Sequence, residues 1–448
     1  MTGIGQLTRG AFRIKDLLRN PYFDSNHRAA HLLKESQLQT TSCRVCFLAA
    51  NAMFQANNIE EAFKILEANE ALFEQKKIET DTKDNAQSKD WLVALLVLKG
   101  KVLENMDNRE QASDVFKEAL KQDPYCQEAL HYLTKHQMLS AEQEQSLLDS
   151  IPLEDDEEKE LIHFLYSIGL KKYDKPKDLK IPKSLENSLR GNLSVEVALA
   201  ERHFYNCDYP ASHQSSTKVM KLDPFHEGCL PIHITCLIEL RKPNDLFLLA
   251  HRLVELYPEW TISWFAVGSY YFLIGKQELA RRYLSRATQL DRVFGPSWLA
   301  YGHSFALENE HDQAIAAYFK AKQLMPGCHL PLLYIGVEYG LTNNVKLAEK
   351  FFTEALDIAP EDPFVLHELG VTCFQNGDFE GAEKQMLMAL DQVNSVKQST
   401  TSSKWESLLN NLGHTARKLG KLEESLDYHQ RALVLKPMAS STYAAIGK

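Results

Sequence analysis

The sequence predicts an all-α protein, a solenoid in which one helical hairpin stacks on the next. Three observations predict it. Gly268, Gly302, Gly336 and Gly370 are evenly spaced, and alanines recur in two further registers with the same spacing. Two stretches one period apart, SWFAVGSYY and SWLAYGHSF, share the same Trp-to-Gly spacing. Bulky apolar residues recur at helical spacing between these marks, and prolines end several of the units.

The period of about 34 residues is that of the tetratricopeptide repeat (TPR), in which each repeat is a helix, a turn and a second helix. Small residues are expected where the two helices of a repeat cross, because a larger side chain would push the helices apart. The stacked repeats are expected to form a right-handed superhelix. The predicted repeat-packing residues are Trp264, Gly268, Ala280, Trp298, Gly302, Ala314, Gly336, Ala348, Gly370, Ala382 and Gly413.

The repeat register divides the chain into four parts. Residues 1–27 are irregular or atypical, and 28–168 are expected to form N-terminal TPR-like helical repeats. Two prolines interrupt the period over 169–192, where a linker is expected. The C-terminal TPR array is expected over 193–448. Its last repeat stops at Lys448 soon after it begins, so we expect the chain to be truncated there.

Composition argues against two classes of partner. The 448 residues carry a formal net charge of −10 without a dense run of Lys or Arg, whereas a phosphate binder needs a basic patch. The sequence has no stretch of about 18 apolar residues, so no transmembrane helix is expected. The eight cysteines are scattered, as is typical of reduced thiols in a cytosolic or nuclear protein. We therefore expect neither nucleic acid nor a membrane as the main partner.

Patterns that would carry catalysis or bind metal are weak. Cys43 and Cys46 form a single CxxC pair without the second pair that a structural zinc site needs. Cys229, His233 and Cys236 have the spacing of soft ligands on one helix face, but His233 also falls at a repeat-core position. We expect no enzyme activity, no cofactor and no metal, with a metal at these three residues as the less favoured alternative.

A stack of helical hairpins has a concave groove, lined mainly by the first helix of each repeat, that suits a peptide segment. Positions next to the core positions are expected to face this groove. They change along the array from apolar and aromatic to polar, and an Asn there both donates to and accepts from a peptide backbone. The predicted groove residues are Phe265, Ser269, Phe272, Leu299, His303, Leu333, Val337, His367, Val371, Phe374, Asn410, His414 and Arg417.

A TPR co-chaperone or adaptor that holds the end of a peptide is an alternative function. A clamp for a terminal carboxylate needs Lys or Arg at groove positions of neighbouring repeats. In the well-defined repeats only Arg417, with Lys418 beside it, meets this requirement. The alternative is therefore less favoured than a scaffold that binds partner proteins.

Some longer strings are more individual than the repeat register. They are LAERHFYNCDYP (199–210), LDPFHEGCLPIHI (222–234), AYGHSFALENEHDQAIAAYF (300–319), GCHLPLLYIGVEYGLTNN (327–344) and LLNNLGHTARKLGKLEESLDYHQRAL (408–433). In these strings the chain closely resembles the cell division cycle protein 16 family, which are TPR subunits of the anaphase-promoting complex (cyclosome). The resemblance covers roughly residues 28–448.

The resemblance implies a non-catalytic scaffold in a multi-subunit ubiquitin ligase that controls mitotic progression. It implies stacking with other TPR subunits, a homodimer through N-terminal repeats, and a small accessory subunit in the C-terminal groove. It also implies a location in the nucleus and cytoplasm, with spindle association in mitosis. The segment 1–27 does not match the family's N-terminal repeats, so we expect this chain to dimerise poorly.

Overall fold

The computed structural model describes residues 43–69, 86–151, 157–170, 172–173, 181–182, 184–185, 189, 191–396 and 403–447. Throughout these ranges the regular secondary structure is helical. The prediction of an all-α protein is therefore confirmed. The predicted irregular N-terminus, residues 1–27, lies outside the described residues, as does most of the expected linker.

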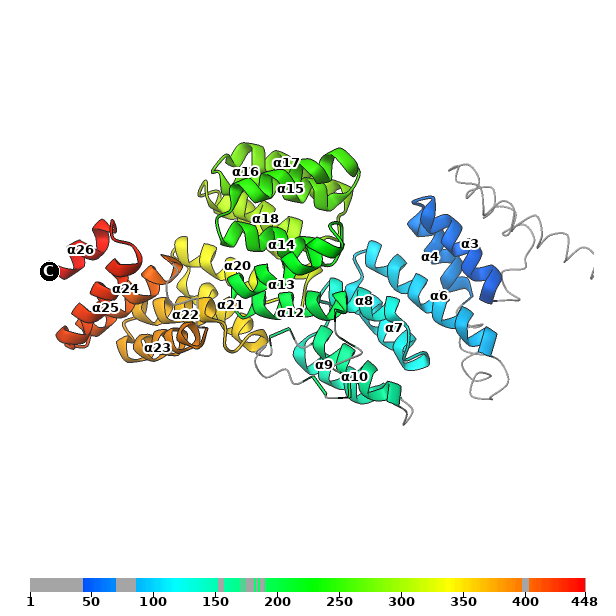
Figure 1. Cartoon of the computed structure of the whole chain (residues 1–448), viewed down its shortest axis with the longest axis horizontal. Coiled ribbons are helices and arrows are strands. Elements are labelled where there is room, and N and C mark those ends of the chain that lie inside the picture. The colour runs from blue at the N-terminus through cyan, green and yellow to red at the C-terminus, as the bar shows by residue number, and fades with distance from the viewer. Residues whose placement is uncertain are drawn as a thin grey trace, which may run out of the picture. The chain divides into compact units, whose positions relative to one another are not determined.

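Helices follow one another along the whole described chain (Figure 1). The N-terminal helices are α3 (Cys43–Gln55), α4 (Ile59–Ala68), α6 (Ala86–Asn105), α7 (Arg109–Gln122), α8 (Gln127–Lys135), α9 (Ala141–Ser150) and α10 (Glu157–Leu170). The middle of the chain forms α12 (Leu193–Tyr205), α13 (Tyr209–Leu222), α14 (Cys229–Glu239), α15 (Pro243–Leu256), α16 (Thr261–Leu273) and α17 (Gln277–Leu290).

The remaining helices complete the C-terminal array. They are α18 (Gly295–Ala306), α19 (His311–Leu324), α20 (Leu330–Leu341), α21 (Val345–Ile358), α22 (Pro363–Gln375), α23 (Phe379–Ser395), the 3-10 helix η3 (Ser403–Trp405), α24 (Glu406–Lys418), α25 (Leu422–Leu435) and α26 (Ser440–Ile446). Most first helices pack most closely against the second helix of their own repeat, as α16 does with α17 and α24 with α25, whereas α14 packs more closely against α13 than against α15.

The chain forms two compact units. One comprises residues 1–139 with 145–159, and the other comprises 140–144 with 160–448. The division falls earlier in the chain than the expected linker over 169–192. In the second unit, Phe164 and Ile168 of α10 pack with Leu189 and with α12, although the repeat register assigned α10 to the N-terminal repeats. The packing of α10 thus extends the second unit towards the N-terminus.

Glycines mark the place where the two helices of a repeat meet. A β-carbon built on Gly268 would lie 2.5 Å from Leu284, and one on Gly336 would lie 2.5 Å from the Phe352 ring. In each case the bulky partner stands on the second helix of the same repeat. Because contacts this short do not occur in folded proteins, the glycine lets a large side chain fill the repeat core.

The turn between the two helices of a repeat also recurs with the period. Gly275 and Gly377 have φ near +80° there, a backbone conformation that L-residues rarely adopt. In other repeats the same position holds Cys207, Arg241, Asn309 or Asn343, with φ between 52° and 63°. Each of these hairpins therefore has one residue in the left-handed backbone conformation, which Gly and Asn adopt at low energetic cost.

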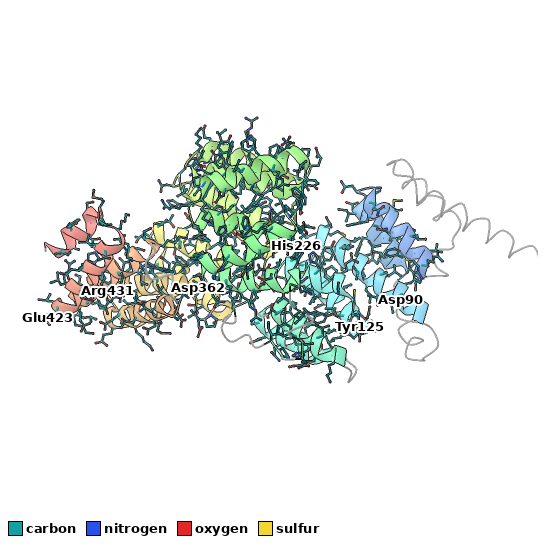
Figure 2. The ribbon with its side chains drawn as sticks, in the orientation of Figure 1. Asp90, Tyr125, His226, Asp362, Glu423 and Arg431 are labelled. Carbon is teal, nitrogen blue, oxygen red and sulfur yellow. The ribbon has the colours of Figure 1, made fainter. Side chains whose placement is uncertain are left out.

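Side chains cap the start of several helices. Asp362, labelled in Figure 2, accepts hydrogen bonds from the backbone N–H groups of Phe364 and Val365 at 2.9 and 3.0 Å. Pro363 follows it at the first helical position, where a missing N–H costs nothing. Asn58, Asn192, Asp208 and Asp378 cap their helices in the same way.

Candidate functional site

The first helices of the C-terminal array carry a row of aromatic and polar side chains, which we call the first-helix wall. It consists of Phe272, His303, Tyr334, His367, Asn410, Asn411, His414 and Arg417. Its aromatic end runs across α16, α18 and α20, and its polar end lies on α22 and α24. The wall contains six of the thirteen predicted groove residues, and Tyr334 and Asn411 join it without having been predicted.

The aromatic end centres on His303. Its ring lies 4.3 Å from the ring of Tyr334 and 6.1 Å from the ring of Phe272, measured between centroids. Its Nδ1 atom is 2.8 Å from the hydroxyl of Tyr318, which lies in the repeat core. Burial lowers the pKa of His303 to about 4. His303 is therefore neutral near pH 7 and presents an uncharged ring.

The polar end is held by a series of hydrogen bonds. The Asn411 amide lies 3.0 Å from Nε2 of His367, and the Asn410 carbonyl oxygen lies 2.8 Å from Nδ1 of His429. The Arg417 guanidinium lies 3.2 Å from Nδ1 of His414. The bond to His429 occupies the Asn410 oxygen, so the Asn410 amide nitrogen remains the group best placed to donate to a bound backbone.

Arg417 also reaches the last described helix, because it donates to the carbonyl of Ala445 at 3.4 Å. Burial lowers the pKa of His429 to about 4, and the charges of His414 and Arg417 act in the same direction. Arg417 is consequently the main positive charge at this end of the wall. Lys418 beside it is exposed and lies near the Phe379 ring.

Three predicted groove residues are instead part of the repeat interior. Phe265, Ser269 and Leu333 are buried, and Phe265 packs its ring against Phe294 of the next repeat at 5.6 Å. A first helix packs against its own partner helix and against the neighbouring repeat, so it buries a wider face than the core register alone indicates. These three side chains cannot line a groove in this structure.

The other predicted groove residues are on the wall or beside it. His367 is buried but hydrogen-bonded to Asn411. The half-buried members are Phe272, Leu299, His303, Val337, Val371, Phe374, Asn410, His414 and Arg417. Their role in binding a segment stays a prediction.

The predicted repeat-packing residues fall into two groups. The alanines Ala280, Ala314, Ala348 and Ala382 are fully buried between helices, and the glycines Gly268, Gly302, Gly336, Gly370 and Gly413 each face a bulky side chain of the second helix. Trp264 and Trp298 are only half-buried. Each donates its indole N–H to the turn before its helix, to the carbonyls of Pro258 and Arg292 at 2.6 and 3.0 Å.

Sequence reasoning missed a set of contacts between segments that are far apart in the chain, which we call the closing contacts. The Tyr173 hydroxyl donates to the carbonyl of Gly327 and accepts from the N–H of His329, both at 3.3 Å. The Cys207 thiol lies 3.9 Å from a carboxylate oxygen of Asp362. These contacts pack the connector before the array and the turn of its first repeat against the turns that precede α20 and α22.

A third closing contact involves the segment before α24. Lys404 forms an ion pair with Glu239, and its ammonium lies 4.4 Å from the centre of the Tyr209 ring. Burial lowers the pKa of Lys404 to about 8. No repeat-core signal announced Tyr173, Cys207 or Lys404, because each lies in a turn or connector, and the recurring turn position of Cys207 does not indicate its contact with Asp362.

The residues of the weak metal-binding pattern are buried or hydrogen-bonded within the repeats. Cys229 and Cys236 are buried, the Cys236 thiol donates to the Ser212 hydroxyl at 3.1 Å, and His233 Nδ1 lies 2.9 Å from the Ser216 hydroxyl. Across the described ranges, no group of three or more His, Cys, Asp or Glu side chains is placed to hold a metal ion. None of the helices that the structure describes combines the length and apolar character needed to span a bilayer.

Comparisons with known proteins agree with the repeat architecture. Two tetratricopeptide repeat models match, one over residues 93–126 and one over 406–436. The first match covers most of α6 and all of α7, and the second covers α24 and α25. Of these helices, α24 carries part of the polar end of the first-helix wall. The prediction of a TPR fold is thereby confirmed.

Relatives match over nearly the whole chain. Cell division cycle protein 16 homolog of Mus musculus is 52% identical over 437 residues, which are 94% of this chain and 70% of the relative. Anaphase-promoting complex subunit 6 of Arabidopsis thaliana is 36% identical, over 94% of this chain and 80% of the relative. A solved structure described as the crystal structure of the APC/C hetero-tetramer Cut9-Hcn1 superimposes with a TM-score of 0.76 at 29% identity, covering 94% of this chain and 80% of that one. This chain belongs to the family of cell division cycle protein 16 and anaphase-promoting complex subunit 6.

Proposed function

We propose that the chain is a non-catalytic scaffold subunit of the anaphase-promoting complex, working in the nucleus and cytoplasm and at the mitotic spindle. The observation that carries the proposal is the 52% identity over 94% of the chain to a cell division cycle protein 16 homolog. The fold supports the proposal, because the repeat glycines let the helices pack closely and the first-helix wall places side chains on a surface where another protein can bind. The scaffold acts by holding other subunits in place, and the ligase chemistry belongs to other members of the complex.

The first-helix wall is the proposed seat of a small accessory subunit. An extended segment would meet aromatic faces at Phe272 and Tyr334 and then hydrogen-bonding groups at Asn410 and Arg417. Stacking on aromatic rings supplies buried apolar area, and the amide of Asn410 satisfies a backbone carbonyl that would otherwise lose its water. The Cut9-Hcn1 structure is a hetero-tetramer, which supports assembly with both an accessory subunit and a second copy of the chain.

The proposed second copy docks through the N-terminal repeats, as the family resemblance implies. Since the segment 1–27 departs from the family pattern, the dimer is expected to be weaker than in relatives. Light scattering at micromolar concentration tests this point. A tight dimer under those conditions would contradict the expectation of weak self-association while leaving the scaffold function in place.

The decisive experiment is affinity purification of the tagged chain from dividing cells, followed by mass spectrometry. We expect several large TPR subunits and a small accessory protein at comparable amounts. Heat-shock chaperones as the main partners, without subunits of the complex, would overturn the proposal and favour the co-chaperone alternative that depends on Arg417.

A matched pair of arginine variants separates the wall from the rest of the surface. Arg417→Ala removes the positive charge at the polar end of the wall, whereas Arg431→Ala removes an exposed arginine that pairs with Asp427 of its own helix at 3.6 Å. We expect Arg417→Ala to lose the accessory subunit and keep the large subunits, and Arg431→Ala to keep both. Equal recovery of the accessory subunit with both variants would contradict the placement on the wall.

A further inference from the structure

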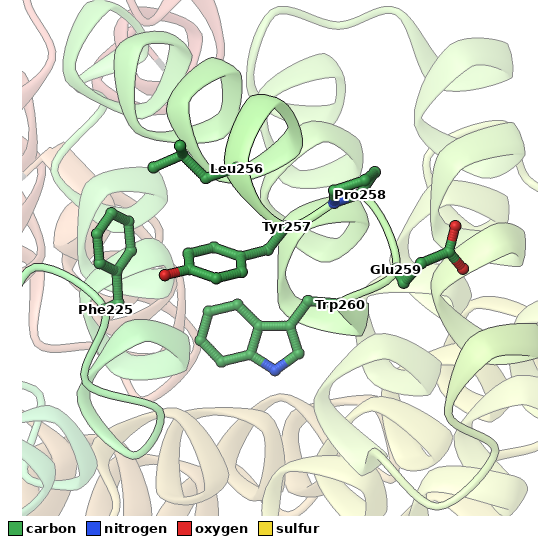
Figure 3. Close-up of a pocket in the computed structure, with 6 residues that line it drawn as sticks. All are labelled: Phe225, Leu256, Tyr257, Pro258, Glu259 and Trp260. Carbon is green, nitrogen blue, oxygen red and sulfur yellow. The ribbon is translucent and has the colours of Figure 1, made fainter. Parts of the chain in front are cut away.

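An aromatic depression lies on the edge of the second unit, away from the first-helix wall. Its volume is about 610 Å³, and it is lined by Phe225, Leu256, Tyr257, Pro258, Glu259 and Trp260, which we call the edge pocket. These residues come from two turns, the one between α13 and α14 and the one between α15 and α16. Figure 3 shows the Tyr257 ring between those of Phe225 and Trp260.

Comparison with the same turn in other repeats shows what is unusual here. The residue after the second helix is Asp123, Asp223 or Asp291 in three other repeats, and each carboxylate accepts the N–H two residues later at 3.0 or 3.1 Å. Such a bond stabilises the turn. Met325, Ala359 and Lys436 replace the aspartate in three further repeats, so its absence at Tyr257 is not unusual in itself. What distinguishes this turn is that the replacement is an aromatic ring that is 43% exposed.

Trp260, the next ring along this turn, is also more exposed than its counterparts in other repeats. Trp260 is half-buried, whereas the residues at its position in the next two repeats, Phe294 and Cys328, are buried. Leu256 is exposed, as are the last leucines of α13 and α17, so the rings rather than the leucine distinguish this turn. Trp260 packs against the core on one side, so its exposed part and the Tyr257 ring are what this turn adds to the surface.

The arrangement of rings indicates what the pocket accommodates. The ring centroids of Phe225 and Tyr257 are 5.2 Å apart at an interplanar angle of 72°, and those of Tyr257 and Trp260 are 5.6 Å apart at 71°. Rings set edge to face form ridges with slots between them. Aromatic ridges of this kind receive proline side chains of a polyproline II segment, which has little conformational entropy to lose.

Charge at the rim selects the flanking residues of such a segment. Glu259 lines the pocket, and Glu255 precedes Leu256; both are exposed, and neither forms an ion pair with any described residue. The Arg252 guanidinium lies 5.1 Å from the centre of the Phe225 ring, so these ring faces already accept a guanidinium. The two carboxylates outnumber this one guanidinium, so the rim is net negative and complementary to lysine or arginine.

We propose that the edge pocket is a docking site for an extended, proline-containing segment of a partner protein that carries lysine or arginine beside its prolines. The prolines seat between the rings of Phe225, Tyr257 and Trp260, and the cations lie against Glu255 and Glu259. This site is separate from the first-helix wall, so one subunit holds two different segments at once.

The test uses the full chain and a short fluorescent proline-rich peptide that carries arginines at both ends, with anisotropy as the readout. We expect saturable binding to the wild-type chain and at least tenfold weaker binding to Tyr257→Asp. That variant installs the turn residue of three other repeats, so it removes the ring while restoring the turn bond. Thermal unfolding of the variant verifies that it stays folded.

Charge variants provide a second, independent measurement that does not touch the apolar packing. The double variant Glu255→Lys and Glu259→Lys, both on exposed positions, is expected to weaken the arginine peptide several-fold and to strengthen a matched peptide with glutamates in place of arginines. Arg417→Ala is expected to bind the arginine peptide as the wild type does. Absence of binding to the wild type, or equal affinity of Tyr257→Asp, would overturn the proposal, as would equal affinity for the two peptides.

Discussion

The repeat formed by α18 and α19 and the repeat formed by α24 and α25 use one architectural device in two chemical versions. In the first, Gly302 faces the ring of Tyr318; in the second, Gly413 faces the ring of His429. In both, the core ring hydrogen-bonds a first-helix side chain at 2.8 Å, His303 in one repeat and Asn410 in the other.

The difference between the two repeats teaches that the core ring also decides the chemistry of the wall. Where the core ring is a tyrosine, the first-helix side chain bonded to it is a neutral histidine that lies between aromatic rings. A histidine in the core holds an asparagine instead, and the wall becomes polar there. The gradient from aromatic to polar along the wall therefore has its origin inside the repeats, and the predictions below test that link.

The largest expected effect is steric. Gly302→Ala would drive a β-carbon into the Tyr318 ring, which is fully buried, so we expect a loss of about 2–3 kcal/mol in the free energy of unfolding. Gly413→Ala meets the His429 ring at 2.6 Å and should cost less, because the imidazole is smaller than a phenol. Chemical denaturation of both variants measures the difference.

Gly340→Ala is the matched control for both substitutions. It lies on α20, and the nearest atom to its β-carbon is the β-carbon of Ala348 at 3.9 Å, an ordinary contact. Alanine favours a helix more than glycine does, so this variant should be neutral or slightly more stable. Destabilisation of Gly340→Ala equal to that of Gly302→Ala would mean that close packing is not what the periodic glycines provide.

The close packing of the two helices in each repeat could be predicted from the sequence, whereas the residues on the surface of the array could be predicted less well. Gly268, Gly302, Gly336 and Gly370 were recognisable because each repeat solves the same steric problem at the same place, which leaves a period in the chain. The left-handed turn residues, such as Asn309 and Asn343, carried the same period and could have been found with it.

Surface positions could be predicted less well, because they depend on neighbours that the repeat register does not specify. Phe265 and Leu333 stand next to core positions, and the adjacent repeat covers them. The closing contacts of Tyr173, Cys207 and Lys404 join turns and connectors that lie far apart in the sequence. Such pairings depend on how tightly the repeats coil, a property of the whole stack rather than of a motif.

A smaller effect is expected from breaking the hydrogen bond between core and wall. Tyr318→Phe leaves Nδ1 of His303 without its partner among aromatic rings, at a cost of about 1–2 kcal/mol. Asn410→Ala breaks the corresponding bond to His429 and should cost less than about 1 kcal/mol, because Asn410 is half-buried and water can replace it. Equal costs would contradict the distinction between an enclosed and a wetter end of the wall.

Titration sharpens the comparison further. The pKa of His303 and that of His429 are both lowered from 6.5 to about 4. The unfolded chain therefore binds protons at these sites before the folded chain does. Their contribution is complete above pH 6.5 and is lost as the pH falls from 6.5 towards 4. At pH 5.5 the loss is about 1 kcal/mol for each histidine, because the two pKa values are lowered by the same amount.

The two histidines differ in cause, which gives a test by NMR titration. Burial alone lowers the pKa of His303, whereas the charges of His414 and Arg417 add to burial at His429. Arg417→Gln is expected to raise the pKa of His429 and leave that of His303 unchanged. A shift of both, or of neither, would show that the polar end of the wall is not set by its local charge.

The smallest expected effect concerns the turns that join the two helices of each repeat. The α18–α19 turn contains Asn309 with φ of 60°, and the α24–α25 turn contains Gly420 with φ of 80°. A β-carbon on Gly420 would have no atom within 4 Å, so any cost of Gly420→Ala arises from backbone strain alone, and we expect about 1 kcal/mol. Asn309→Ala should cost less, because asparagine already bears part of that strain. Thermal unfolding orders the two variants, and a larger loss for Asn309→Ala would show that its side chain, rather than its backbone, holds the turn.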